Sequence, residues 1–226
     1  MKMRPFLLRL FPTGVAGAEL VEFQGAAPLF PSEMSLVRGA VRKRREEFQA
    51  GRHCAREALA QLGHPPVPLL RDAQRAPIWP QGIVGSISHA GGFCGAVVAR
   101  RGAIVALGFD VERRDAVTLD LWPRIASAEE HAEGEVQGSS DARSMVFSAK
   151  EAFYKAQYTL SRSWLEFEDV SIRIVDDGRF EVRLERTVPG VARRGALIPG
   201  QFRFSESLVF CAVALTEHDS SGSSPA

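Results

Sequence analysis

Two amphipathic stretches, each followed by segments of alternating apolar residues, divide this chain into halves of similar organisation. Residues 46–62 and 144–160 carry apolar side chains at spacings of three and four, which predicts two helices. Gly63 and the prolines after it end the first stretch. Alternating apolar residues predict strands at 83–88, 170–174 and 180–184, and apolar runs predict strands at 93–99, 103–111 and 208–215. We expect the strands at 93–99 and 103–111 to form a hairpin.

The order of these elements predicts an α+β fold. The expected boundaries are an N-terminal α+β half over residues 1–107 and a C-terminal α+β half over 108–216. The polar, acidic segment 126–144 is expected to be a mobile insertion or a helix and loop. The Ser- and Gly-rich residues 217–226 are expected to form a disordered tail.

Composition narrows the function classes. The net charge of +1 over 226 residues gives no general attraction to nucleic acid, so anions must be bound by local clusters. No apolar run reaches the ~20 residues that span a bilayer, and we expect neither a membrane span nor a signal peptide. Cys54, Cys94 and Cys211 lack metal-site spacing, so we expect reduced thiols and a cytoplasmic protein.

Two acidic motifs are candidates for chemistry. Asp110 and Glu112 end a predicted strand at positions i and i+2, so both point to one face and repel each other unless a cation lies between them. Few carboxylates with room for phosphate oxygens suit Mg²⁺. Glu151 and Lys155 share a helix face. The alternatives are solvent-exposed acidic residues and a surface ion pair of small energy.

Basic residues gather in the first half. Arg42, Lys43, Arg44 and Arg45 precede the first long helix, Arg52 and Arg56 lie within it, and Arg71 and Arg75 follow it. They form either a phosphate cradle or a solvated basic face. The segment from Gly85 to Gly92 places Ser86 and Ser88 on one strand face beside His89. Those groups either hold phosphate oxygens or stabilise a turn.

Taken together, these segments resemble the Sfp-type 4′-phosphopantetheinyl transferases, in the branch of the enterobactin synthetase component and the mycobacterial enzyme. The resemblance covers residues 40–215 and rests on segments KRREEF (43–48), GRHCAR (51–56), Trp79-Pro80, GSISH (85–89), GFDVE (108–112), FSAKEAFYKA (147–156) and WLEFED (164–169). Phe109 departs from the family, which usually has a smaller aliphatic residue there, and Arg71 stands where relatives can carry lysine.

The resemblance implies a role for each matching position. Asp110, Glu112 and Glu151 match the magnesium ligands, and Glu151 also matches the acceptor of the serine proton, directly or through a metal-bound water. Lys155 matches a catalytic lysine near the pyrophosphate of coenzyme A, with Lys150 as its companion. The remaining matches contact coenzyme A: Ser88 and His89 at its phosphates, and Arg44, Arg52 and Arg71 around its 3′-phosphate.

The resemblance also implies a fold and a reaction. The two halves would be related by a pseudo-twofold axis, with coenzyme A in the cleft between them. The enzyme, expected to be a monomer, would transfer the 4′-phosphopantetheine group to a serine of an apo acyl, peptidyl or aryl carrier protein and release 3′,5′-ADP. Secondary metabolite or siderophore pathways would use it. A non-catalytic module that binds coenzyme A or a carrier is the alternative, and a nucleic-acid-binding protein is a weaker one.

Overall fold

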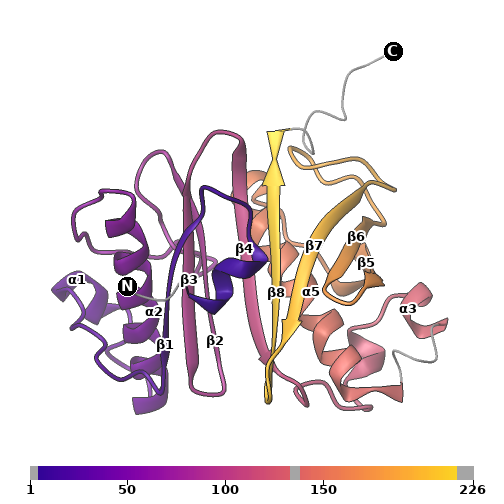
Figure 1. Cartoon of the computed structure of the whole chain (residues 1–226), viewed down its shortest axis with the longest axis horizontal. Coiled ribbons are helices and arrows are strands. Elements are labelled where there is room, and N and C mark those ends of the chain that lie inside the picture. The colour runs from indigo at the N-terminus through magenta and orange to yellow at the C-terminus, as the bar shows by residue number, and fades with distance from the viewer. Residues whose placement is uncertain (1–4, 133–137, 218–226) are drawn as a thin grey trace.

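The computed structural model describes residues 5–132 and 138–217 (Figure 1). The expected disordered tail lies outside these residues except for Glu217, as does part of the expected mobile segment. The helical elements are η1 (Phe6–Leu10), α1 (Pro31–Ser35), α2 (Arg42–Gln61), η2 (Trp122–Arg124), α3 (Ala128–Ala132), α5 (Ser140–Ser161) and η3 (Phe167–Asp169). The strands are β1 (Ala16–Val21), β2 (Ile83–Ala90), β3 (Phe93–Arg100), β4 (Ile104–Arg113), β5 (Val170–Asp176), β6 (Arg179–Leu184), β7 (Leu197–Phe204) and β8 (Leu208–Thr216).

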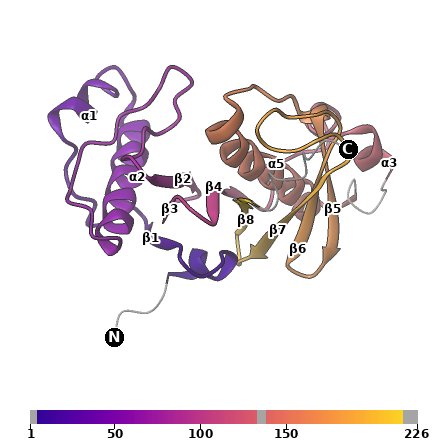
Figure 2. The same ribbon diagram turned by 90° about the horizontal axis from the view of Figure 1, so that it is seen from above.

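The strands form two antiparallel sheets, so the α+β prediction is confirmed. One sheet has the order β1-β3-β2 and the other β4-β8-β7-β6-β5. The long helix α2 packs against β1 and β3, and α5 packs against β4 and β8. Both helices lie on the same side of the sheets, and η1 lies on the opposite side (Figure 2). Each half is thus a helix on an antiparallel sheet.

Three apolar cores hold these layers together. One lies between α5 and the five-stranded sheet and includes Trp122 and Phe153. A second lies between α2 and the three-stranded sheet. The third, beneath η1, joins side chains of β3, β4 and β8, such as Phe93, Phe109 and Phe210. Because this third core draws on both sheets, it fixes one half against the other.

The predicted hairpin of residues 93–99 and 103–111 is wrong. Strand β3 pairs with β1 and β2, whereas β4 pairs with β8 in the other sheet. The real hairpin is β2–β3, in which Ala90 opposes Phe93. Gly91 and Gly92 form its turn with φ of 54° and 84°, a conformation that favours glycine. Alternation identifies strands but not their partners, and the paired glycines were the missed signal.

The two sheets meet where β2 runs beside β4. Ser86 Oγ accepts a hydrogen bond from the Phe109 N–H at 3.0 Å, and Ser88 Oγ accepts one from the Val111 N–H at 3.3 Å. These serines therefore satisfy backbone groups of β4 that lack a strand partner on this side. On the helix side, a Cβ at Gly108 would lie 1.8 Å from the carbonyl oxygen of Ala152, so glycine lets α5 lie directly on β4.

Both predicted helices begin four residues before the start that their apolar pattern predicts. Helix α2 starts at Arg42 and α5 at Ser140, where the Ser139 hydroxyl accepts a hydrogen bond from the Ala142 N–H at 3.3 Å. Strands β1 and β7 were not predicted.

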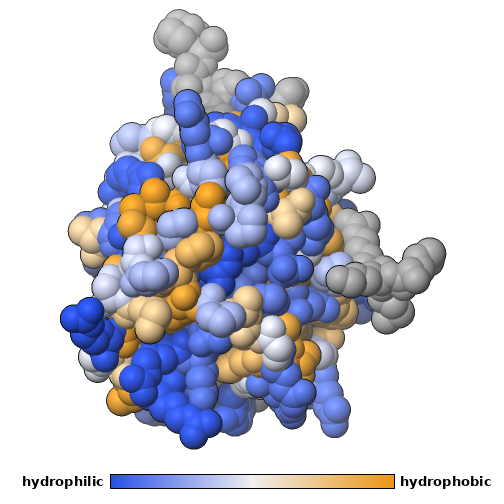
Figure 3. Space-filling view, turned by 90° about the vertical axis from the view of Figure 1, so that its left-hand side faces the viewer, coloured by the Kyte–Doolittle hydropathy of each residue, from blue (hydrophilic) through white to orange (hydrophobic). Residues whose placement is uncertain are grey.

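On the side of the N-terminal half, apolar side chains form patches between hydrophilic ones (Figure 3). Among the described residues, we find no helix long and apolar enough to cross a bilayer.

Candidate active site

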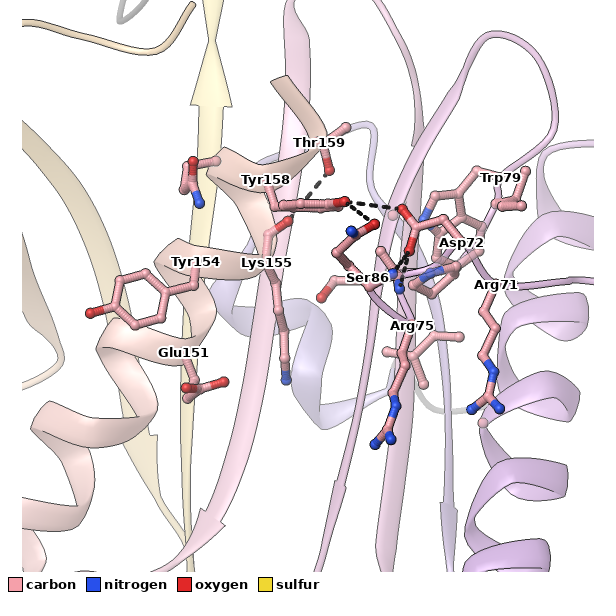
Figure 4. A pocket seen from close by; sticks show the side chains of 18 of the residues that line it. Arg71, Asp72, Arg75, Trp79, Ser86, Glu151, Tyr154, Lys155, Tyr158 and Thr159 are labelled. Atoms are coloured by element: carbon pink, nitrogen blue, oxygen red, sulfur yellow. Dashed lines mark hydrogen bonds between the residues drawn. The ribbon is translucent and has the colours of Figure 1, made fainter. Parts of the chain in front are cut away.

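A pocket of about 760 Å³ lies between the two halves of the molecule. One wall is formed by α2, the loop around residues 71–79 and β2, and includes Arg44, Arg52, Arg71 and His89. The opposite wall is formed by α5 and the segment that follows it, and includes Glu151 and Lys155. Figure 4 shows the α5 side chains facing the arginines across this space. Six predicted site residues therefore line one pocket.

Asp110 lies at the floor of the seam between β2 and β4. Asp110 as a whole is 3% exposed, and its Oδ1 accepts hydrogen bonds from Lys155 Nζ at 2.6 Å and Ser88 Oγ at 2.9 Å. Oδ2 accepts a third from Ser148 Oγ at 2.9 Å. Strand β4, β2 and α5 thus converge on one carboxylate. The structure thus brings Asp110, Ser88 and Lys155 together, and the roles expected for them stay predictions.

Burial, together with nearby negative charge, raises the pKa of two carboxylates, Glu112 and Glu151. Burial, reinforced by the charges of Asp110 and Glu151, raises the pKa of Glu112 to about 7, although Lys155 partly opposes this. Burial also raises the pKa of Glu151, where Asp110 adds to the effect and Lys155 again opposes it. Three acidic groups therefore lie within electrostatic reach of one another with one lysine among them.

This donor set fits a hard divalent cation in its chemistry. The carboxylates repel one another and offer oxygen ligands only, as Mg²⁺ requires. In the described part of the chain, however, no three His, Cys, Asp or Glu side chains lie close enough together to hold a metal ion. The ammonium group of Lys155 instead neutralises Asp110. The metal-ligand roles of Asp110, Glu112 and Glu151 stay a prediction.

Lys155 spans the seam between the halves. Besides Asp110, its ammonium group donates to Ser88 Oγ at 3.1 Å and to the Phe109 carbonyl oxygen at 3.3 Å. It is one helical turn beyond Glu151, and both line the pocket. Lys155 therefore places a positive charge beside Asp110, in the wall that faces the arginines.

The structure does not bring Lys150 into this site, contrary to the prediction. Its side chain is fully buried, and Nζ donates to Glu130 Oε2 at 2.7 Å and to the carbonyl oxygens of Ile125 at 2.9 Å and Phe167 at 2.8 Å. All three ammonium protons are used in this way. Lys150 lies one residue before Glu151, about 100° around the helix, and so faces away from the pocket. It ties α5 to α3 and η3.

The wall that carries Arg44, Arg52 and Arg71, called the arginine wall below, contains side chains that are held by different contacts. Arg44 donates from Nη1 to His89 Nε2 at 2.9 Å, and burial lowers the pKa of His89, so the neutral ring accepts this bond. Arg71 donates from Nη2 to the Leu36 carbonyl oxygen at 3.0 Å. Arg52 is 5% exposed, and its guanidinium lies 4.2 Å from the Phe48 ring centroid.

Arg52 also has a structural task. Its Nε donates to the Leu69 carbonyl oxygen at 2.7 Å, and burial lowers its pKa to about 10. The Leu69 N–H donates in turn to Glu33 Oε1 at 2.8 Å, so both backbone groups of Leu69 are held by buried charged residues. Arg52 therefore anchors the start of the loop that carries Arg71 as well as lining the pocket.

Sequence reasoning did not single out several pocket residues, three of which are polar residues that face the cavity. Asp72, Tyr154 and Tyr158 line the cavity, and Tyr158 contacts Asp72 across it (Figure 4). Helical spacing could have identified the tyrosines, because they lie three and seven residues after Glu151. No pattern in the loop singles out Asp72.

Comparison with known proteins identifies this arrangement. Residues 32–99 match the family described as the 4′-phosphopantetheinyl transferase N-terminal domain, and residues 106–205 match the 4′-phosphopantetheinyl transferase superfamily. The 4′-phosphopantetheinyl transferase PptT of Mycobacterium tuberculosis is 38% identical over 84% of this chain and 87% of its own length. Npt of Nocardia iowensis is 33% identical over 91% and 97%, respectively. Enterobactin synthase component D of Escherichia coli is 35% identical over 58% and 64%.

The chain belongs to the 4′-phosphopantetheinyl transferases of the Sfp type. It is a holo-[carrier-protein] synthase, which transfers phosphopantetheine to carrier proteins.

Proposed function

We propose that the pocket between α2 and α5 binds coenzyme A, with the 3′-phosphate toward the arginine wall and the pyrophosphate toward Lys155. One observation carries this placement: a single cavity has Arg44, Arg52 and Arg71 on one wall and Glu151 and Lys155 on the other. Arginine suits a terminal phosphate because its planar guanidinium can form two parallel hydrogen bonds. His89 of β2 lines the same pocket and contacts Arg44, and the neighbouring Ser88 contacts Lys155.

The two halves are proposed to be related by a pseudo-twofold axis, with the boundary near Leu107. The pairing of one long helix with one antiparallel sheet in each half supports this. Their shared pocket makes the ligand a bridge between the halves. Lys150 has no part in binding because its ammonium group is buried and fully paired.

The reaction starts with the hydroxyl of a carrier serine. Its oxygen attacks the β-phosphorus of coenzyme A, forming a P–O bond as the bond to the leaving phosphate breaks. The phosphopantetheine remains on the serine, and 3′,5′-ADP departs. Such transfers depend on positioning and charge compensation. Mg²⁺, held by Asp110, Glu112 and Glu151, would neutralise the pyrophosphate and fix its orientation.

Glu151 is proposed to take the serine proton. Its carboxylate lines the pocket, and its raised pKa makes it a better proton acceptor than an ordinary glutamate. Lys155 offsets the negative charge that develops on the leaving phosphate. To reach that phosphate the ammonium group must loosen its 2.6 Å contact with Asp110.

The acceptors are proposed to be apo acyl, peptidyl or aryl carrier domains. The similarity to relatives named enterobactin synthase component D favours a role in siderophore or other secondary metabolite biosynthesis. We propose a cytoplasmic monomer, in keeping with Cys54, Cys94 and Cys211, which are free and buried.

Arg71→Ala tests the placement of the ligand. Arg71 is a better probe than Arg52, which also anchors Leu69. A charge-assisted hydrogen bond contributes about 1.5–3 kcal/mol, so the Kd for coenzyme A should rise about tenfold or more. The Kd for dephospho-coenzyme A, which lacks the 3′-phosphate, should change little. Isothermal titration calorimetry measures both, with Arg173→Ala on β5 as the control; equal losses for the two ligands would contradict the placement.

A further inference from the structure

Asp72 shapes the turn that carries two of the pocket arginines. It lies between Arg71 and Arg75 in a loop closed by a hydrogen bond from its own N–H to the Ala76 carbonyl oxygen at 2.9 Å. Its Oδ1 accepts hydrogen bonds from the N–H groups of Gln74 at 3.0 Å and Ala76 at 2.8 Å. An aspartate that accepts bonds from residues just after it fixes a turn.

This turn imposes an unfavourable backbone conformation on Arg75. Its φ is 69°, in the left-handed region, which costs a residue with a side chain about 1–2 kcal/mol. The Arg75 N–H donates to the Asp72 carbonyl oxygen at 3.0 Å. Arg75 also lines the pocket. The direction of the Arg75 side chain therefore depends on the turn that Asp72 holds.

The other carboxylate oxygen of Asp72 faces the opposite half of the molecule. Oδ2 accepts a hydrogen bond from Tyr158 Oη of α5 at 3.3 Å (Figure 4). It accepts another from Nη1 of Arg162, the residue that follows α5, at 3.1 Å. The Tyr158 hydroxyl also lies 3.0 Å from Gln74 Oε1. Arg162, with φ of 53°, places its guanidinium 5.2 Å from the Tyr158 ring centroid. One carboxylate thus joins the two walls.

The contact of Asp72 with Tyr158 and Arg162 contributes little to the free energy of folding. The side chain of Arg162 is 63% exposed and that of Asp72 is 23% exposed. Exposed pairs of this kind contribute ~0–1 kcal/mol to stability. The contact therefore contributes little to folding, and its removal should leave both cores intact. It nevertheless joins two walls that line the same pocket.

We propose that Asp72 is a positioning residue for coenzyme A, which it serves by fastening the arginine turn to α5. The inference rests on the proposed ligand placement. With Asp72 in place, Arg71 and Arg75 are held toward one end of the ligand while α5 holds Glu151 and Lys155 at the other. Without it, the turn samples other conformations, and binding must select the competent one. That selection raises Kd by the inverse of the competent fraction.

Asp72→Ala should raise the Kd for coenzyme A about tenfold if one molecule in ten keeps the competent turn. The Kd for dephospho-coenzyme A should rise less, because it lacks the phosphate that the arginines would bind. At saturating coenzyme A, kcat should stay within about twofold, since the loss is in binding and not in the chemical step. Calorimetry and steady-state kinetics with an apo carrier measure these quantities.

Two further variants separate the contacts that Asp72 makes within its turn from those that it makes with Tyr158 and Arg162. Asp72→Asn keeps the oxygen that accepts from Gln74 and Ala76 but loses the acceptor for Tyr158 and Arg162, so it should lose affinity, though less than Asp72→Ala. Tyr158→Phe removes only one of the two contacts with α5 and should lose no more affinity than Asp72→Asn. If neither Asp72→Ala nor Tyr158→Phe changed the Kd for coenzyme A, the positioning role would be refuted.

Glu181→Ala is the matched control. It removes the Glu181–Arg173 pair between β5 and β6, whose side chains are 26% and 63% exposed, close to the values of the Asp72 pair. It should reproduce any stability loss of Asp72→Ala without changing Kd; an equal rise in Kd would contradict the proposal. Failure of the proposed function would look different, because the wild-type protein itself would then neither bind coenzyme A nor modify a carrier.

Discussion

The surroundings of Glu112 disfavour the ionised form of its carboxyl group. It follows the buried strand core of β4, two residues after Asp110, and burial is the main cause of its raised pKa. A carboxylate held in this way makes the folded protein less stable when it is ionised, unless a cation compensates. That is the expected property of a metal ligand in the absence of its metal.

Without metal, the stability of the protein should depend on pH through Glu112. Its pKa is about 7 in the folded state against a reference value of 4.5. The folded state therefore binds more protons over this window, so stability falls as pH rises from 4.5 to 7. Glu112→Gln removes this effect, and thermal melts in a chelating buffer should show it gaining on wild type between pH 5 and pH 8.

Glu57 on α2 is exposed, so the variant Glu57→Gln controls for the loss of a negative charge alone. A difference in melting temperature between Glu112→Gln and wild type that stayed constant across this pH range would show that Glu112 is not strained by its surroundings.

At the scale of elements, a buried ion pair connects α3 to α5. Glu130 Oε2 accepts from Lys150 Nζ at 2.7 Å and from the Ser127 N–H at 2.6 Å, while Oε1 accepts from the Ile172 N–H at 2.7 Å. Ser127 and Glu130 also form the reciprocal hydrogen bonds that cap α3. The same lysine donates to the carbonyl oxygen of Phe167, which itself lines the pocket.

Lys150→Met should destabilise the protein by about 3–5 kcal/mol, because it leaves the Glu130 carboxylate buried without its partner. The double variant Lys150→Met/Glu130→Gln should recover part of this loss, since it buries no unpaired charge and keeps an acceptor oxygen. Urea denaturation of the two single variants and the double variant measures the coupling. If Lys150→Met were as stable as wild type, the buried pair would be refuted.

How much could be predicted from sequence differs between elements. Helical period placed Glu151 and Lys155 on one face, and the period of two placed Asp110 and Glu112 together, because both follow from local geometry. The partner of β4 could not be predicted, since strand pairing depends on the whole sheet. Lys150 was misplaced because motif matching ignored its angle on the helix, and Asp72 acts through a turn that has no local signature.

At the scale of the whole molecule, the pocket exists because two sheets meet without merging. Ser86 and Ser88 bridge β2 to β4, and the core beneath η1 locks the halves on the opposite face. Helices α2 and α5 lie on the other side, with the pocket between them. This arrangement brings arginines from one half and Glu151 from the other to a single pocket.

We expect the carboxylates at this seam to carry out the transfer. Intact-mass spectrometry of an apo carrier incubated with coenzyme A, Mg²⁺ and enzyme tests it directly. Wild type should add the mass of one phosphopantetheine, whereas Asp110→Asn and Glu151→Gln should leave the carrier unmodified while melting as folded proteins. Modification by either variant at a rate close to that of wild type, at saturating Mg²⁺, would contradict the account.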